Sequence, residues 1–156
     1  MSKVRPGYRG KVPRVLVIDD EAPIQLLCRV NLEAARIQVS EAEDGKTGLE
    51  TARAERPDVI LLDVMMPGMD GWQVFDELRK DESTAEIPII FLTARAELRD
   101  QARGLEIGGV DYVTKPFNPL NLAALIEDLL ARIERGEAQE LRGKRLAELR
   151  QLLVSD

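Results

Sequence analysis

The chain has 156 residues, of which 44% are hydrophobic and 32% charged, and its formal net charge is −6. This length suits a single domain, because a chain of about 150 residues buries about 68–70% of the surface that it exposes when unfolded. The composition argues against a membrane protein, since no apolar run approaches the about 18 residues that a membrane span needs. With no histidine and one cysteine, the chain has no internal disulfide and is a poor candidate for a zinc site.

The N-terminal segment differs in charge from the rest of the chain. Residues 1–14 contain five Lys or Arg and no acid, which leaves 17 basic against 28 acidic residues and a net charge of −11 for the remainder. An acidic body argues against general nucleic-acid binding. We expect residues 1–12 to form a basic flexible leader; the alternative is an electrostatic docking arm. The leader lacks the apolar middle of a secretory signal, so we expect a cytoplasmic protein.

Apolar, β-branched runs alternate with amphipathic stretches of helical length along the chain. The predicted strands and helices, in chain order, lie at 15–18, 21–35, 37–42, 45–55, 59–62, 71–80, 87–92, 97–107, 110–113 and 119–134. Asp44-Gly45 and Asp70-Gly71 are predicted to open helices, and Gly108-Gly109 to close one. Cys28 lies in an apolar helical stretch and is predicted to fill the core. This alternation predicts an α/β fold with a parallel sheet and helices on both faces.

The residues that follow the predicted strands are rich in chemically active groups. In such open sheets the functional crevice lies at the carboxyl ends of the strands. Those ends carry Asp19-Asp20-Glu21, Asp63, Thr93-Ala94 and Thr114-Lys115-Pro116. Neighbouring carboxylates repel one another, so they require raised pKa values or a bound cation, and a few oxygen ligands with room for a phosphate suit Mg²⁺.

The same strand ends provide the components of phosphoryl transfer. Lys115 supplies a positive charge and Thr93 a hydroxyl donor, while Asp63 is the candidate acceptor. A single Asp at a strand end is more often a turn or helix-cap residue, so no one of these residues establishes the function. The four strand ends together favour the phosphoryl-transfer interpretation.

Four motifs in order carry a resemblance to a known family. They are V-L-V-I-D-D-E (15–21), V-I-L-L-D-V-M-M-P-G-M-D-G (59–71), I-I-F-L-T-A (89–94) and D-Y-V-T-K-P-F (111–117). With these separations the chain closely resembles, over about residues 13–134, the receiver domain of two-component response regulators. The resemblance implies a doubly wound, flavodoxin-like parallel sheet of five strands in the order 2-1-3-4-5.

The resemblance also implies a phosphorylation site with a metal ion. Asp63 would accept the phosphoryl group from a phosphohistidine on a histidine kinase or phosphotransfer protein. Asp20 would ligate Mg²⁺ directly, Asp19 mainly through water, and the backbone carbonyl of Met65 would add a ligand. Lys115 would pair with Asp63 and later with the phosphoryl oxygens.

A conformational switch is implied at the neighbouring strands. Thr93 would move to hydrogen-bond a phosphoryl oxygen, Tyr112 would swing inward behind it, and the Lys115-Pro116 peptide would be cis. This shift of population would alter the surface formed by residues 97–134 and so control a partner protein. Met65 and Arg95, at variable positions of the family, would set the lifetime of the phosphorylated state.

The residues after 134 predict a charged helical tail, 135–156. It is too short for a DNA-binding domain, so we expect a stand-alone receiver without an output domain. A terminal helix is predicted beyond Gly136, although Gly143 weakens it. Its apolar stripe of Leu146, Leu149 and Leu153 either folds back on its own domain or frays, or else docks a partner or a second copy in a homodimer.

The sequence is compatible with three functions. The first is a phosphoacceptor regulator, either a switch or a phosphorelay intermediate that passes the phosphoryl group to another histidine, and not an enzyme. The second is a phosphatase of the haloacid dehalogenase type, which needs a second Asp where this chain has Met65. The third is a nucleic-acid regulator that uses the basic leader, with strongly salt-dependent binding. The four motifs favour the first.

Overall fold

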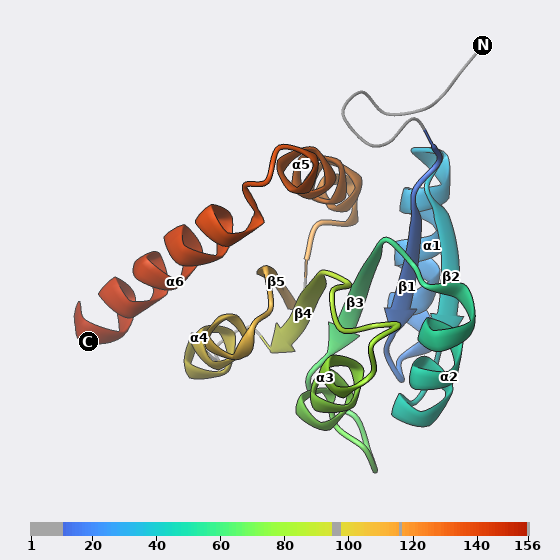
Figure 1. Cartoon of the computed structure of the whole chain (residues 1–156), viewed down its shortest axis with the longest axis horizontal. Helices are drawn as coiled ribbons and strands as arrows, with labels where there is room; N and C mark the ends of the chain where they lie inside the picture. The colour runs from blue at the N-terminus through green and yellow to red at the C-terminus, as the bar shows by residue number, and fades with distance from the viewer. Residues whose placement is uncertain (1–10, 95–97, 116, 156) are drawn as a thin grey trace.

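The protein folds around one parallel sheet. The computed structural model describes residues 11–94, 98–115 and 117–155. Five strands are hydrogen-bonded in the order β2-β1-β3-β4-β5, and each neighbouring pair is parallel, which confirms the predicted fold and strand order (Figure 1). The strands are β1 (Arg14–Ile18), β2 (Gln38–Ala42), β3 (Val59–Asp63), β4 (Ile89–Ala94) and β5 (Asp111–Lys115).

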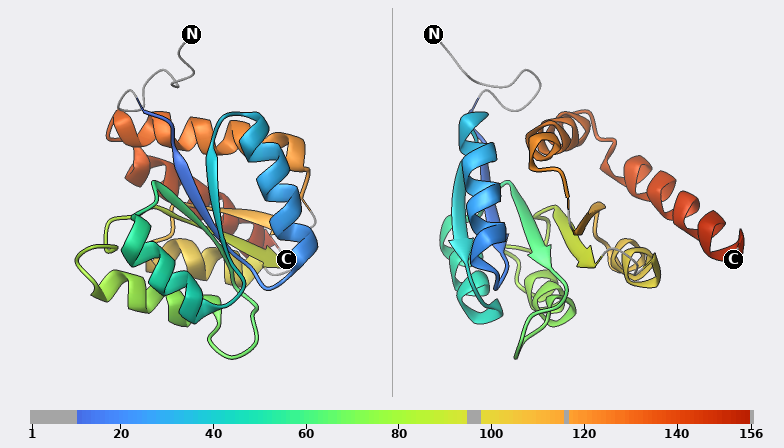
Figure 2. Two further views of the ribbon diagram at one scale, coloured as in Figure 1. Left: turned by 90° about the vertical axis from the view of Figure 1, so that its right-hand side faces the viewer. Right: turned by 180° about the vertical axis from the view of Figure 1, so that it is seen from behind.

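Helices connect the strands and cover both faces of the sheet (Figure 2). They are α1 (Ala22–Ala34), α2 (Gly45–Glu55), α3 (Gly71–Lys80), α4 (Leu98–Ile107), α5 (Leu122–Glu134) and α6 (Ala138–Ser155), with a 3₁₀ turn, η1 (Pro119–Asn121), before α5. One core cluster joins the sheet to α1 and α5, and a second joins its other face to α2 and α3. None of the helices in the described ranges combines the length and apolar character that a membrane span requires.

The central strands are buried on both faces, which explains their uninterrupted apolar sequences. Along β1, Val15 and Val17 face the α1/α5 side, while Leu16 and Ile18 face the α2/α3 side. Cys28 is fully buried in the α1/α5 cluster, as predicted.

The two predicted Asp-Gly helix starts are confirmed. Asp44 accepts a hydrogen bond of 2.8 Å from the Thr47 amide, and Asp70 forms a reciprocal capping box with Gln73. Gly71 then brings α3 back against the end of β3. A Cβ atom at Gly71 would lie 2.4 Å from the carbonyl oxygen of Asp63, so the loop after β3 requires glycine at this position.

Most element boundaries differ from prediction by one or two residues, and three differences change the description of an element. β4 begins at Ile89 and not at 87, because the preceding Pro88 has no amide proton to donate to the sheet. β5 runs from Asp111 to Lys115, so the lysine belongs to the strand and does not follow it. The last predicted helix of the domain is split into η1 and α5.

The predicted terminal helix is present as α6 and lies against its own domain. After Gly136, whose φ of 75° suits glycine, the chain turns from α5 toward α4. α6 contacts α4, β5 and α5, and Figure 1 shows it running from the end of α5 to the side of the sheet where α4 lies. Of the two predicted arrangements, the structure therefore has the helix folded back.

Candidate functional site

An acidic cluster lies at the carboxyl ends of β1 and β3. Because the two strands are neighbours in the sheet, Asp19, Asp20 and Glu21 come next to Asp63 at this edge. Carboxylate oxygens of the four residues lie within 4.8 Å of one another. Asp19 and Asp63 are 0% and 3% exposed, whereas the other two side chains face solvent. The predicted meeting of carboxylates at the strand ends is therefore present in the fold.

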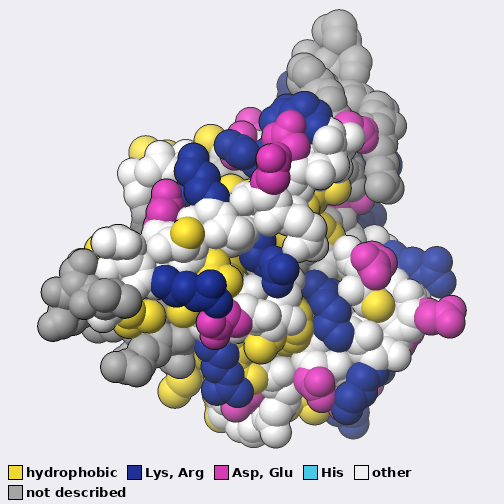
Figure 3. All heavy atoms as spheres, turned by 60° about the vertical axis from the view of Figure 1, so that its left-hand side comes forward, with side chains coloured by type: hydrophobic (Ala, Val, Ile, Leu, Met, Phe, Trp, Pro, Cys, Tyr) yellow, Lys and Arg dark blue, Asp and Glu magenta, His cyan; other side chains and the backbone are white. Residues whose placement is uncertain are grey.

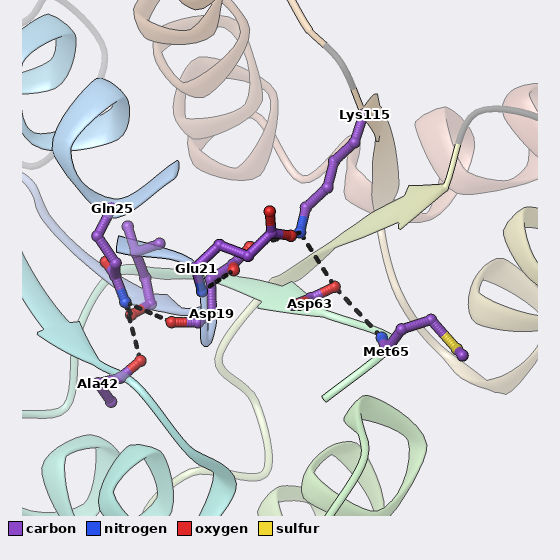
Figure 4. Close-up of polar contacts among 8 residues, drawn as sticks. Asp19, Glu21, Gln25, Ala42, Asp63, Met65 and Lys115 are labelled. Carbon is purple, nitrogen blue, oxygen red and sulfur yellow. Dashed lines mark hydrogen bonds and ion pairs between the residues drawn. The ribbon is translucent and has the colours of Figure 1, made fainter. Parts of the chain in front are cut away.

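Lys115 reaches this cluster from β5. Its ammonium nitrogen lies 2.8 Å from Asp19 Oδ2, 3.1 Å from Glu21 Oε2 and 3.3 Å from Asp63 Oδ1 (Figure 4). The lysine side chain spans the intervening strand β4 to do so. One cation thus faces three acids, and its shortest contact is with Asp19.

Burial and crowding perturb the acids of the cluster. Burial, reinforced by the negative charge of Asp19, raises the pKa of Asp63 to about 7, although Lys115 and the Met65 amide oppose the rise. Burial also raises the pKa of Asp19, against the hydrogen bonds from Lys115 and the Glu21 amide. Burial alone would lower the pKa of Lys115, but its bonds to the acids, Asp19 foremost, raise it above the ordinary value.

The donor set fits a hard divalent cation. Within the described residues, Asp63 Oδ2 is buried and has no hydrogen-bond partner. A buried carboxylate oxygen without a partner is costly, so it points to a cation that completes the site. Oxygen ligands from a few carboxylates suit Mg²⁺, and the described cluster contains neither His nor Cys.

The remaining predicted site residues surround the cluster in different ways. The Met65 amide donates a hydrogen bond of 3.2 Å to Asp63 Oδ1, while the methionine side chain is 70% exposed. Thr93 is 1% exposed in β4, and its Oγ1 accepts a hydrogen bond of 3.3 Å from Gln101 Nε2. Tyr112 is partly buried against a small cluster shared by α4 and α6. Arg95 and Pro116, with the predicted cis peptide, lie outside the described residues.

Sequence reasoning missed Gln25 as part of this edge. The Gln25 side chain on α1 is 7% exposed, and its Nε2 lies within hydrogen-bond distance of three carbonyl oxygens, those of Val17 (3.2 Å), Asp19 (3.0 Å) and Ala42 (2.9 Å). It therefore ties the ends of β1 and β2 together directly behind Asp19 (Figure 4). Gln25 is a polar residue on the face of α1 that otherwise packs on the sheet. This position in the sequence pattern could have indicated a structural role for the amide.

Comparison with known proteins decides the family. The family model described as the response regulator receiver domain matches residues 15–127. This chain belongs to the response regulator receiver family. It is the receiver domain of a two-component response regulator, and receiver domains are phosphoacceptors in signal transduction.

Curated relatives agree with this assignment. The chain is 43% identical over 124 residues to the DNA-binding dual master transcriptional regulator RpaA of Synechocystis, covering 80% of this chain and 52% of the relative. It is 42% identical over 128 residues to the phosphate regulon transcriptional regulatory protein PhoB of Escherichia coli, covering 82% and 56%. The matched part of the receiver thus spans about half the length of these curated relatives.

Solved structures share the receiver fold. A putative response regulator from Chloroflexus aurantiacus superposes with a TM-score of 0.73 at 31% identity, covering 78% of this chain and all of the other. The Vibrio cholerae chemotaxis protein CheY4 gives a TM-score of 0.70 at 30% identity, covering 76% and 98%. These matches cover the other two chains almost completely, and they leave 22% and 24% of this chain unmatched.

Proposed function

We propose that this protein is a phosphorylation-dependent switch in which Asp63 accepts a phosphoryl group with Mg²⁺. The observation that carries the proposal is the state of the Asp63 carboxylate. One of its oxygens is buried without a hydrogen-bond partner among the described residues, and the other faces the ammonium of Lys115. A carboxylate placed in this way is compensated only in part, and it is open to a cation and a phosphoryl group.

Asp63 acts as the nucleophile. Its carboxylate oxygen forms a P–O bond while the P–N bond of a phosphohistidine on a histidine kinase or phosphotransfer protein breaks. Because the pKa of Asp63 is about 7, the side chain is protonated in a sizeable fraction of the molecules at neutral pH. Only the ionised form can act as the nucleophile. Asp19, Asp20, Asp63 and the Met65 carbonyl would hold Mg²⁺, which favours the ionised carboxylate and neutralises charge on the phosphoryl oxygens.

Lys115 and Thr93 serve the transferred group. Lys115 partly compensates the charges of Asp19 and Asp63 before phosphorylation and moves to a phosphoryl oxygen afterwards. The Thr93 hydroxyl, which accepts a hydrogen bond from Gln101 before phosphorylation, turns to donate to another phosphoryl oxygen. Tyr112 then moves inward. Coupling of this kind is typically about 1–3 kcal/mol, which changes the population of the active conformer about 5- to 150-fold.

The phosphoryl group leaves by attack of water on phosphorus, which regenerates the Asp63 carboxylate and releases inorganic phosphate. Met65, exposed two residues after the acceptor, and Arg95 set the access of that water and hence the lifetime. Transfer to a histidine of a phosphotransfer protein is the alternative exit. It makes the protein a phosphorelay intermediate.

RpaA is named as DNA-binding and PhoB as a transcriptional regulator. Because the match covers about half of each relative, we propose for this chain only the phosphoacceptor role. DNA binding is a property of those relatives and is not part of the proposal.

Intact-protein mass spectrometry tests the proposal. Incubation with Mg²⁺ and acetyl phosphate is expected to add one phosphoryl group to the wild-type protein and none to Asp63→Asn. Asp76→Asn, which removes an acid of α3 that is 65% exposed and pairs with Lys80, is the matched control and is expected to be labelled normally. Labelling of Asp63→Asn would refute the assignment. Loss of the label from the wild-type protein over time measures the lifetime.

A further inference from the structure

α6 packs against α4 and β5 at one side of the domain. Leu149 is fully buried there between Ala102 and Leu105 of α4, and Leu146, Leu153 and Tyr112 pack around them. These contacts form a small hydrophobic cluster, separate from the two main cores. The face that comes forward in Figure 3, where α4 and α6 lie, carries basic side chains next to acidic ones with hydrophobic side chains between them.

Two polar contacts fix α6 in register on this surface. Arg145 Nε lies 3.3 Å from Oδ1 of Asp111, the first residue of β5, whose side chain is almost completely buried. Arg142 Nη1 donates a hydrogen bond of 3.1 Å to the Leu105 carbonyl at the end of α4. A third contact, between Arg150 and Glu106, is largely exposed, so it contributes little.

The same helix α4 is tied to the phosphorylation site by Gln101. This side chain is 2% exposed, and its Nε2 donates to Thr93 Oγ1 at 3.3 Å and to Thr114 Oγ1 at 3.1 Å. The next residue, Ala102, contacts the α6 cluster. One turn of α4 therefore touches the switch threonine on one side and α6 on the other.

We propose that α6 is an intramolecular cap on the α4–β5 face, and that phosphorylation of Asp63 weakens its docking through Thr93, Gln101 and Tyr112. The inference rests on the proposed function. When the Thr93 hydroxyl turns to the phosphoryl group, Gln101 Nε2 keeps its bond to Thr114 but loses the one to Thr93, which favours a shift of α4 that gives the freed N–H another partner. When Tyr112 moves inward, the cluster that seats Leu149 loses its aromatic ring.

The cap is suited to release. Three residues of its cluster are buried, against fifteen in the core shared by α1 and α5, and that core includes Leu141 near the start of α6. The part of α6 beyond Leu141 can therefore detach without unfolding the domain, while its first turn stays in the core. Coupling of this kind is reciprocal: if phosphorylation weakens α6 docking, weaker α6 docking must favour the phosphorylated conformer by the same factor. The output surface of the switch is thus hidden by its own tail until Asp63 is modified.

Hydrogen exchange on the full chain tests this inference. Beryllofluoride with Mg²⁺ serves as the stable mimic of the phosphoryl group, and mass spectrometry follows peptides from residues 142–153, beyond Leu141. Exchange in these peptides is expected to rise when beryllofluoride binds. Leu149→Ser is expected to raise their exchange without beryllofluoride and to tighten beryllofluoride binding, measured by calorimetry, by a factor between about 5 and 150.

The controls lie on the same helix. Leu152→Ser, at a position that is 52% exposed, is expected to change neither the exchange nor the affinity. Arg145→Gln removes the ion pair with Asp111 without opening the hydrophobic cluster, and it is expected to act in the same direction as Leu149→Ser, with a smaller effect. It also serves as the second variant if Leu149→Ser fails to fold.

The outcomes separate this inference from the proposed function. If neither beryllofluoride nor acetyl phosphate acts at Asp63 in the wild-type protein, the proposed function fails and the coupling fails with it. If beryllofluoride binds but α6 exchange stays constant, and the variants bind it with unchanged affinity, only the coupling is refuted. Protection of α6 that increases with protein concentration would place the helix on a second copy and overturn the intramolecular cap.

Discussion

The ammonium nitrogen of Lys115 lies 2.8 Å from Oδ2 of Asp19, a shorter contact than the 3.3 Å that separates it from the proposed acceptor, Asp63. In the absence of metal, the lysine is therefore the main counter-charge of the buried acid that follows β1. A divalent cation bound among the same oxygens must compete with this ammonium for negative charge.

Lys115→Met is expected to tighten Mg²⁺ binding, because the acids then have no competing cation. At pH 8, above the pKa of Asp63, we expect an effect of roughly tenfold, which corresponds to about 1.4 kcal/mol. Isothermal titration calorimetry measures it. Lys80→Met, at an exposed site on α3, is the charge-matched control and is expected to bind like the wild type. Weaker binding by Lys115→Met would show that the lysine does not compete with the ion.

Asp63→Asn is expected to stabilise the metal-free protein at neutral and alkaline pH. Burial raises the pKa of Asp63 from 3.8 to about 7, so the folded state holds its proton more tightly than the unfolded state. The stabilising contribution of the protonated side chain is complete below pH 3.8 and is lost as the pH rises through 7. The full difference corresponds to about 4 kcal/mol, and Asn, which cannot ionise, avoids this loss.

Urea denaturation with EDTA at several pH values between 4 and 8 measures this effect. The stability difference between Asp63→Asn and the wild type should grow steadily with pH and level off above 7, and it should shrink when Mg²⁺ is added. Asp76→Asn, at an exposed acid, should show no such trend. A difference that is independent of pH would contradict a raised pKa.

Gly71→Ala is expected to damage the loop that shapes the site. The added Cβ would lie 2.4 Å from the Asp63 carbonyl oxygen and 2.8 Å from Val64 Cα, and neither backbone atom can move alone. Overpacking of this kind costs about 1–3 kcal/mol, and the displaced Asp63 should accept phosphoryl from acetyl phosphate more slowly. Thermal denaturation and the rate of labelling measure the two effects.

Gly143→Ala provides the matched control for that substitution. Nothing lies within 4 Å of a Cβ atom at Gly143, which is inside α6. Alanine is favoured over glycine in a helix by about 0.5–1 kcal/mol, so this variant should be more stable and should be labelled normally. Equal effects of the two substitutions would show that the close approach at Gly71 is not the cause.

The sequence predicted the sheet well because its central strands are buried on both faces. Such strands have continuous apolar sequences, and Asp44 and Asp70 mark helix starts by hydrogen bonds that are local in sequence. The meeting of Asp19 with Asp63 followed from the rule that parallel strands end at one edge. The start of β4 was predicted two residues early because the apolar run was followed through Pro88, although a proline has no amide proton to donate to a sheet.

The contacts that the sequence could not supply join residues far apart in the chain. The preference of Lys115 for Asp19 depends on how a long side chain crosses β4, and no spacing encodes that path. The position of α6 depends on Arg145 meeting Asp111, 34 residues away. Its leucine stripe was compatible with a folded-back helix and with a docking helix, and the structure of the single chain shows the folded-back arrangement.

Gln25→Leu is expected to destabilise the edge of the sheet that holds Asp19. The two side chains are similar in size, so the substitution removes the amide without opening a cavity. The buried carbonyl oxygens of Val17, Asp19 and Ala42 then lose a shared donor. Loss of a buried hydrogen-bond partner costs about 1–3 kcal/mol, and we expect the lower half of that range because the Ala42 carbonyl also accepts from the Asp19 amide.

Urea denaturation of Gln25→Leu and of Asn31→Ala tests this role. Asn31 lies on the same helix and donates to the Leu27 carbonyl, but this bond is exposed, so its removal should change stability by less than about 0.5 kcal/mol. If Gln25 also positions Asp19, the Gln25→Leu protein should bind Mg²⁺ more weakly under conditions in which it is fully folded. A variant that loses stability but binds the ion normally would restrict Gln25 to holding β1 and β2 together.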